Sequence, residues 1–175
     1  MKKLGKIIIY YGKGEGKTSA ALGRAIRMAG YGKRVIILHF MKWRKTGEYK
    51  FFQKIKTKRL QTAVHLCGFP EFLTKKNYLQ HQKRTQQALA LAQEIIKDQN
   101  CDLLVLDEIL YTLKFKLLKE KDVLNLLKGR GKIHVILTGN FLSKKLREFA
   151  DQISKISKIK HYFNKGQKTI KGLEY

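Results

Sequence analysis

The sequence contains very little proline and cysteine. One proline and two cysteines occur among 175 residues. Two cysteines cannot build a disulfide framework, and neither Cys67 nor Cys101 belongs to a Cys-x-x-Cys pair of the kind that indicates zinc or redox chemistry. We therefore expect both thiols to be buried and inert. With 43% hydrophobic residues, the scarcity of proline also argues against extended disorder.

The sequence also lacks a long apolar run. No stretch approaches the roughly 20 apolar residues that a helix needs to cross a bilayer. The first residues, Met1, Lys2 and Lys3, lead directly into a strand-like stretch and a glycine loop rather than into a targeting segment. We therefore expect a cytoplasmic protein without a membrane partner.

Acidic side chains are scarce. The chain has 38 lysines and arginines against 13 aspartates and glutamates, a formal net charge of +25. Such a charge attracts polyanions, including nucleic acid, triphosphate and acidic membrane surfaces. The lysines are interspersed with apolar residues, as solvated positions are, so a general compositional trait remains an alternative to a specific nucleic-acid face.

What the sequence does contain is apolar runs of strand length that alternate with helical patterns. Strands are predicted at 6–11, 34–40, 60–67, 103–106, 133–138 and 153–163, and helices at 18–29, 75–97, 119–128 and 143–149, the last with Ser143 as N-cap. Residues 41–59 are rich in charged and aromatic side chains, and no helix or strand is predicted there. This alternation predicts an α/β fold with a doubly wound, mostly parallel sheet, and the length favours one domain, 1–175. A glycine loop between the first strand and the first helix assigns this sheet to the P-loop nucleotide-binding type.

A glycine loop lies between the first strand and the first helix, where a phosphate-binding P-loop requires it. Glycines let backbone N–H groups turn toward an anion, Lys17 can reach phosphate oxygens, and the Thr18 hydroxyl can ligate Mg²⁺. Tyr11 stands where the stricter pattern has glycine, so this is a shortened variant, and an ordinary glycine turn is the alternative. The predicted ATP-binding residues are Gly12, Lys13, Gly14, Glu15, Gly16, Lys17, Thr18 and Ser19.

Two carboxylates follow the buried strand 103–106, at the sheet edge where open α/β sheets bind ligands. Asp107 or Glu108 can hold Mg²⁺ directly or through water, with helix capping as the alternative. Thr138 and the two residues after it should reach the same edge, where a plain turn is equally compatible with the sequence. His65-x-Cys67 is too weak a pattern to indicate a metal site.

With these features in view, the sequence resembles the P-loop type of corrinoid adenosyltransferase, the cob(I)yrinic acid a,c-diamide or cob(I)alamin adenosyltransferase family. The resemblance covers nearly the whole chain. It is carried by the glycine loop 12–18, the Gly-Arg-Ala-x-Arg-x-x-Gly-x-Gly run 23–32, Phe40-x-Lys42 with Gly47-Glu48, 105–108, 135–139, Ala150-Asp151, Lys160-His161-x-Phe163 with Gly166, and 171–175.

The resemblance implies an enzyme of cobalamin biosynthesis that moves the 5′-deoxyadenosyl group of ATP to Co(I) of cobalamin or cob(I)yrinic acid a,c-diamide and releases triphosphate. Since Co(I) itself attacks, no protein nucleophile is implied, and Lys17 and Thr18 would stabilise the triphosphate. It further implies Mg²⁺ held by Thr18 with Asp107 or Glu108, an electron donor such as a reduced flavoprotein, and a homodimer.

The resemblance also implies a corrinoid site formed by Phe69, Phe72, Lys42 and Glu48. The chain departs from the family pattern at Glu15, where the family usually has lysine. It departs again after Gly68-Phe69, where Phe72 stands near the place of a tryptophan.

A nucleic-acid-binding P-loop ATPase is the competing interpretation. It explains the net charge, and one segment interleaves basic and aromatic side chains as nucleic-acid-binding surfaces do. These residues are Lys42, Trp43, Arg44, Tyr49, Phe51 and Phe52. A nucleotide-bound regulator without catalysis is a third interpretation.

Overall fold

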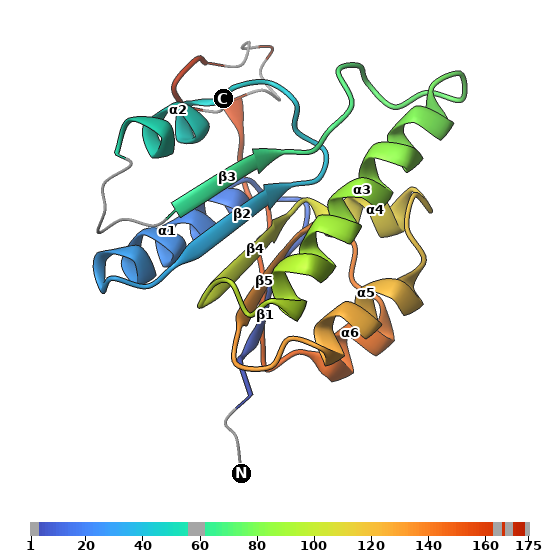
Figure 1. Cartoon of the computed structure of the whole chain (residues 1–175). Coiled ribbons are helices and arrows are strands. Elements are labelled where there is room, and N and C mark those ends of the chain that lie inside the picture. The colour runs from blue at the N-terminus through green and yellow to red at the C-terminus, as the bar shows by residue number, and fades with distance from the viewer. Residues whose placement is uncertain (1–3, 56–61, 163–165, 167–169, 174–175) are drawn as a thin grey trace.

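In the part of the chain that the structure describes, six parallel strands form one sheet in the order β3-β2-β4-β5-β1-β6, and Figure 1 shows this sheet with β1 to β5 labelled. The computed structural model describes residues 4–55, 62–162, 166 and 170–173. The strands are β1 (Ile7–Tyr11), β2 (Val35–His39), β3 (Thr62–Leu66), β4 (Leu103–Asp107), β5 (His134–Gly139) and β6 (Gln152–Lys155). Every paired neighbour is parallel, which confirms the predicted α/β class.

Helices cover both faces of this sheet. They are α1 (Lys17–Gly30), α2 (Gly47–Lys54), α3 (Tyr78–Lys97), α4 (Ile109–Lys114), α5 (Glu120–Lys128) and α6 (Lys144–Phe149). Figure 1 shows α1 and α2 on one side and α3 to α6 on the other. No helix in the described part of the chain has the length and apolar character needed to span a membrane.

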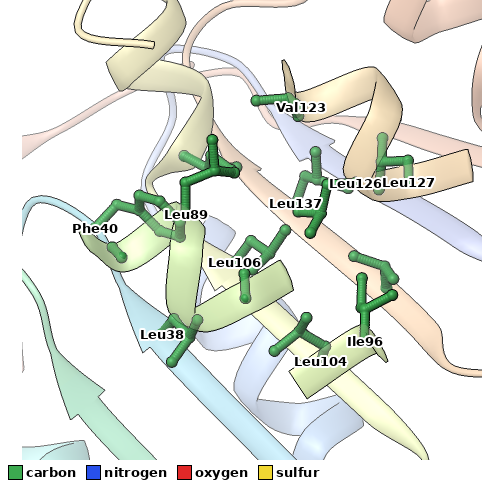
Figure 2. Close-up of a cluster of buried hydrophobic side chains, with 14 of the residues drawn as sticks. Leu38, Phe40, Leu89, Ile96, Leu104, Leu106, Val123, Leu126, Leu127 and Leu137 are labelled. Carbon is green, nitrogen blue, oxygen red and sulfur yellow. The ribbon is translucent and has the colours of Figure 1, made fainter. Parts of the chain in front are cut away.

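Alternate strand residues supply the two cores. Ile7 and Ile9 pack on the α3 to α6 side, and Ile8 and Tyr10 pack on the α1 side. The larger cluster, in which Leu104 and Leu106 of β4 meet α3 and α5, is drawn in Figure 2. Burial on both faces explains why the strands appear in the sequence as continuous apolar runs rather than as alternating patterns.

The predicted last strand, 153–163, is too long. β6 ends at Lys155, and Phe163 lies outside the described residues. Among the described residues β6 pairs with β1 alone, and β1 ends at Tyr11, so no strand of that part of the chain continues the pairing beyond Lys155. Instead, Ile156 N donates to Tyr11 O at 2.8 Å, and the chain turns along the glycine loop.

Two helices were not predicted. α2 lies in the segment 41–59 that received no element, and α4 begins directly after the acidic strand end. Both are short, and α2 buries only Phe52, so neither has a long amphipathic pattern. The predicted helix 75–97 begins at Tyr78, and residues 60–61 of the predicted third strand lie outside the described residues.

The predicted N-cap of α6 is confirmed, because Ser143 Oγ accepts a hydrogen bond from Leu146 N at 3.1 Å. Ser143 Oγ also donates to the Glu120 carboxylate of α5. We expect Ser143→Ala to lower the free energy of unfolding by about 1 kcal/mol in urea denaturation, because it leaves a helix N–H without its acceptor. Ser157→Ala, at an exposed serine, is the control. Equal stability of both variants would contradict the prediction.

Candidate functional site

The glycine loop between β1 and α1 is packed against two other segments. Gly12 N donates to Gly139 O at 3.1 Å, and Gly14 N donates to Ile156 O at 3.0 Å. A Cβ on Gly12 would lie 2.2 Å from Ile156 O, and one on Gly14 would lie 2.7 Å from the Ser157 carbonyl carbon. Gly16, with φ of 92°, is the N-cap residue of α1. Glycine is therefore required here for close backbone approach as well as for chain reversal.

A pocket of about 850 Å³ opens beside this loop. It brings together residues from the loop, α1, α2, the end of β4 and the carboxyl-terminal segment. The lining consists of Lys13, Glu15, Gly16, Lys17, Thr18, Ser19, Leu22, Gly23, Ile26, Lys42, Gly47, Glu48, Glu108, Tyr111, Lys158, His161, Gly172 and Leu173. Most of the predicted phosphate-binding residues thus share one concave surface with the predicted carboxylate Glu108.

Asp107 is fully buried at the end of β4 and has four side-chain partners. Its Oδ1 accepts hydrogen bonds from Thr18 Oγ1 at 2.8 Å and from Thr138 Oγ1 at 2.7 Å. Its Oδ2 lies 2.7 Å from His39 Nδ1 and 3.2 Å from Lys42 Nζ. Burial by itself would raise the pKa of Asp107, but these hydrogen bonds and the Lys42 charge hold the pKa below its ordinary value.

Glu108 differs from its neighbour because it lines the pocket. Its φ of 63° is left-handed, and its N–H donates to Thr138 Oγ1 at 2.8 Å. Burial and the adjacent Asp107 charge raise the pKa of Glu108. Thr138 therefore joins both acidic residues and is more than part of a plain turn. Two neighbouring carboxylates in different environments can take different roles toward a cation.

Lys42 joins this acidic cluster from the loop after β2. Its Nζ lies 3.1 Å from Glu48 Oε1, and α2 places Glu48 in its first turn. Burial would lower the pKa of Lys42, but the surrounding carboxylates raise it; burial would raise the pKa of Glu48, but Lys42 lowers it. Lys42 and Glu48, predicted for corrinoid binding, therefore form charged pairs beside Asp107 in the same pocket.

The other two residues predicted for corrinoid binding lie in the loop after β3, and neither lines the pocket. The ring of Phe69 packs against the ring of His81 of α3, with centroids 5.2 Å apart and planes at 58°, whereas Phe72 is 91% exposed. Asn77 holds the loop: its Oδ1 accepts from Thr74 N at 2.7 Å, and its Nδ2 donates to Phe72 O at 2.9 Å.

Several residues of this region were not predicted from the sequence as site residues. They are His39, Tyr111, Lys158 and His161. His39 pairs in register with Asp107 across β2 and β4, an alignment that requires knowledge of the strand order. His161 belongs to a motif that carries the family resemblance, which was the available signal.

Cys101 is buried, as predicted, whereas Cys67 is only partly buried because it follows the edge strand β3, where its N–H donates to His39 O at 3.0 Å. Burial raises the pKa of Cys67 to about 11 and that of Cys101 to about 12, so both stay protonated at neutral pH, as expected for inert side chains.

The parallel sheet, the glycine loop before α1 and the buried Asp107 bonded to Thr18 define a P-loop nucleotide-binding α/β protein. The KaiC-like protein PH0186 from Pyrococcus horikoshii OT3 has the same kind of fold, with a TM-score of 0.52 at 18% identity over 87% of this chain and 72% of that chain.

The chain belongs to the family of ATP:corrinoid adenosyltransferases BtuR/CobO/CobP, whose model matches residues 3–175. It is 30% identical to the corrinoid adenosyltransferase of Pseudomonas aeruginosa over 98% of this chain and 84% of that protein. It is also 30% identical to corrinoid adenosyltransferase CobA of Salmonella typhimurium, over 98% of this chain and 86% of that protein. The predicted family is thereby confirmed.

Proposed function

We propose that this chain transfers the 5′-deoxyadenosyl group of ATP to Co(I) of cobalamin or cob(I)yrinic acid a,c-diamide and releases triphosphate. The observation that supports this most directly is that one pocket combines Lys17, Thr18 and the loop backbone with the acidic end of β4. The reaction is a substitution at carbon in which the reduced cobalt of the substrate is the nucleophile. The protein therefore needs to hold the reactants in line and stabilise the leaving triphosphate.

The side chains present fit these tasks. Lys17 and the loop N–H groups offer donors for phosphate oxygens, and the start of α1 adds partial positive charge. Lys17 Nζ donates to Gly14 O, so it lies folded over its own loop. Its pKa is lowered by burial, which the charges of Glu108 and Asp107 oppose. This ammonium has given up part of its hydration and is available to a polyanion.

The donor set also fits Mg²⁺. Hydroxyl and carboxylate oxygens are the ligands this ion prefers, and the Thr18 hydroxyl already meets Asp107 at 2.8 Å. We propose that Thr18 holds the ion together with Glu108 or, through water, Asp107. When bound, Mg²⁺ supplies positive charge against the triphosphate, and His39 and Lys42 keep Asp107 ionised and oriented.

We further propose that Phe69 contributes an apolar lining beneath the corrin, together with Phe72 once a corrinoid covers that exposed ring. On the basis of the family, we also propose that the protein is a homodimer, that a reduced flavoprotein supplies its electrons, and that it is cytoplasmic.

The direct test is an anaerobic assay with MgATP and chemically reduced cobalamin or cob(I)yrinic acid a,c-diamide. We expect the visible spectrum of a light-sensitive adenosyl product to appear together with inorganic triphosphate. ADP and phosphate without that spectrum would contradict the proposal and favour the nucleic-acid-binding ATPase. Tight oligonucleotide binding that survives physiological salt would then support that competing function.

Phe69→Ala is expected to slow adenosylation of a Co(II) corrinoid supplied with a reductant by about 10- to 100-fold, because the ring no longer excludes water or positions the substrate. The dissociation constant of ATP, measured by calorimetry, should stay nearly unchanged. Leu79→Ala, which removes an exposed apolar side chain of α3, is the control. Equal losses in adenosylation and in ATP affinity would overturn this assignment.

A further inference from the structure

The segment after β6 forms part of the wall of the P-loop pocket. Ile156 N donates to Tyr11 O at 2.8 Å, and Ile156 O accepts from Gly14 N at 3.0 Å, so backbone hydrogen bonds attach this segment to the loop. Lys158 and His161 then reach the pocket. The same surface that the loop presents to phosphate is therefore completed by residues more than 140 positions later in the chain.

Glu15 is the one acidic residue in the loop sequence 12–19, and it lines this pocket with Lys13 and Lys17. Its Oε1 lies 2.6 Å from His161 Nε2, an ion pair when the imidazole is protonated. The two partners are unequally accessible, since the Glu15 side chain is 62% exposed and that of His161 only 11%. The His161 ring also stacks on Tyr162 with centroids 4.4 Å apart and planes at 28°.

A carboxylate in this position opposes the binding of a polyphosphate. Like charges a few ångströms apart repel, and the repulsion is reduced when a group that can carry positive charge lies against the carboxylate. The partly buried, stacked His161 ring lies within ion-pair distance of this carboxylate, and backbone hydrogen bonds at Ile156 attach the segment that carries it to the glycine loop.

We propose that His161 is a determinant of triphosphate binding: it holds the Glu15 carboxylate against the carboxyl-terminal segment and offsets its charge, so that the loop accepts a polyanion. The inference rests on the proposed placement of triphosphate at the P-loop. His161 is thus a positioning residue that acts through Glu15. Its effect on triphosphate binding should therefore depend on whether residue 15 carries a negative charge.

The test measures binding of inorganic tripolyphosphate by isothermal titration calorimetry, without corrinoid and therefore without turnover. We expect His161→Ala to weaken binding by roughly 5- to 10-fold at low salt, and the loss to shrink as salt screens the exposed carboxylate. His161→Lys should retain binding because it places a cation beside Glu15. Glu15→Gln should bind at least as tightly as the unmodified chain.

The decisive measurement is the double variant. In a Glu15→Gln background, His161→Ala should weaken tripolyphosphate binding by less than about twofold, because the carboxylate whose charge His161 offsets is no longer present. His65→Ala, an exposed histidine of β3, is the control, and thermal melting verifies that each variant is folded. The inference would be overturned if His161→Ala weakened tripolyphosphate binding as much in the Glu15→Gln background as in the unmodified chain, or if His161→Ala alone did not weaken it.

The outcomes separate this inference from the function on which it rests. Tripolyphosphate binding by the unmodified chain with no effect of His161→Ala would refute the role of His161 alone. Absence of any binding by the unmodified chain would refute the placement of triphosphate at the P-loop and the inference with it. Adenosyl transfer measured in parallel tests the reaction itself.

Discussion

Replacing Lys17 by alanine is expected to lower kcat/KM for adenosyl transfer by about 10²- to 10³-fold, the range found when a preorganised donor is removed from a developing negative charge. Lys17 begins α1 inside the pocket, and its Nζ donates a hydrogen bond to Gly14 O of the glycine loop. The measurement is steady-state adenosylation with MgATP in excess, followed at the spectrum of the product. Lys97→Ala, at an exposed lysine in the last turn of α3, should retain full activity.

A melting measurement distinguishes a loss of catalysis in Lys17→Ala from a loss of folding. Burial lowers the pKa of Lys17 below its unfolded value, so the folded state binds this proton less tightly than the unfolded chain does. The protonated side chain therefore costs stability below its folded pKa, and the cost disappears as the pH rises above the unfolded pKa. Lys17→Ala should accordingly melt at the same temperature as the unmodified chain or slightly higher at neutral pH. Activity within about threefold of the unmodified chain would contradict the assigned role.

Gly12→Ala is expected to lower the free energy of unfolding by about 2 to 4 kcal/mol and to abolish measurable ATP binding. Gly12 has φ of 125°, which strains any residue with a Cβ. The added carbon would also lie 2.2 Å from Ile156 O, a backbone atom held by the hydrogen bond between Ile156 N and Tyr11 O. The collision can be relieved only by moving the loop or the segment after β6, and both form the pocket.

Gly32→Ala is the matched control. Gly32 also has a positive φ, 74°, but a Cβ there meets nothing within 4 Å. Gly32→Ala should lower the free energy of unfolding by about 1 to 2 kcal/mol, the strain of a non-glycine residue in the left-handed region, and should leave ATP binding unchanged. Urea denaturation at constant m-value and calorimetry with ATP measure the two effects. Equal destabilisation by both substitutions would show that backbone strain, and not the close approach of Ile156, accounts for the requirement at Gly12.

The sheet and the P-loop could be predicted from the sequence because each depends on local features. Strands buried on both faces are continuous apolar runs, and the glycine loop has residues whose type and order are dictated by phosphate geometry. The position of Asp107 follows equally, since the last residue of a parallel strand must lie at the carboxyl edge of the sheet.

The surroundings of these residues could not be predicted in the same way. α2 and α4 are short, and their formation depends on the sheet and loops they contact rather than on a long periodic pattern. The predicted continuation of β6 failed because β1 offers no partner beyond Tyr11, a limit set by strand pairing and not by the apolar character of Ile156.

The amino-acid sequence by itself therefore determined the fold class, the phosphate loop and the acidic strand end, because these require particular residue types at short spacings. Only the tertiary structure decided which side chains surround them: His39 and Lys42 on Asp107, and His161 on Glu15. Those contacts join residues far apart in the chain, and they are set by strand order and by the path of the chain after β6. No local pattern encodes either of these.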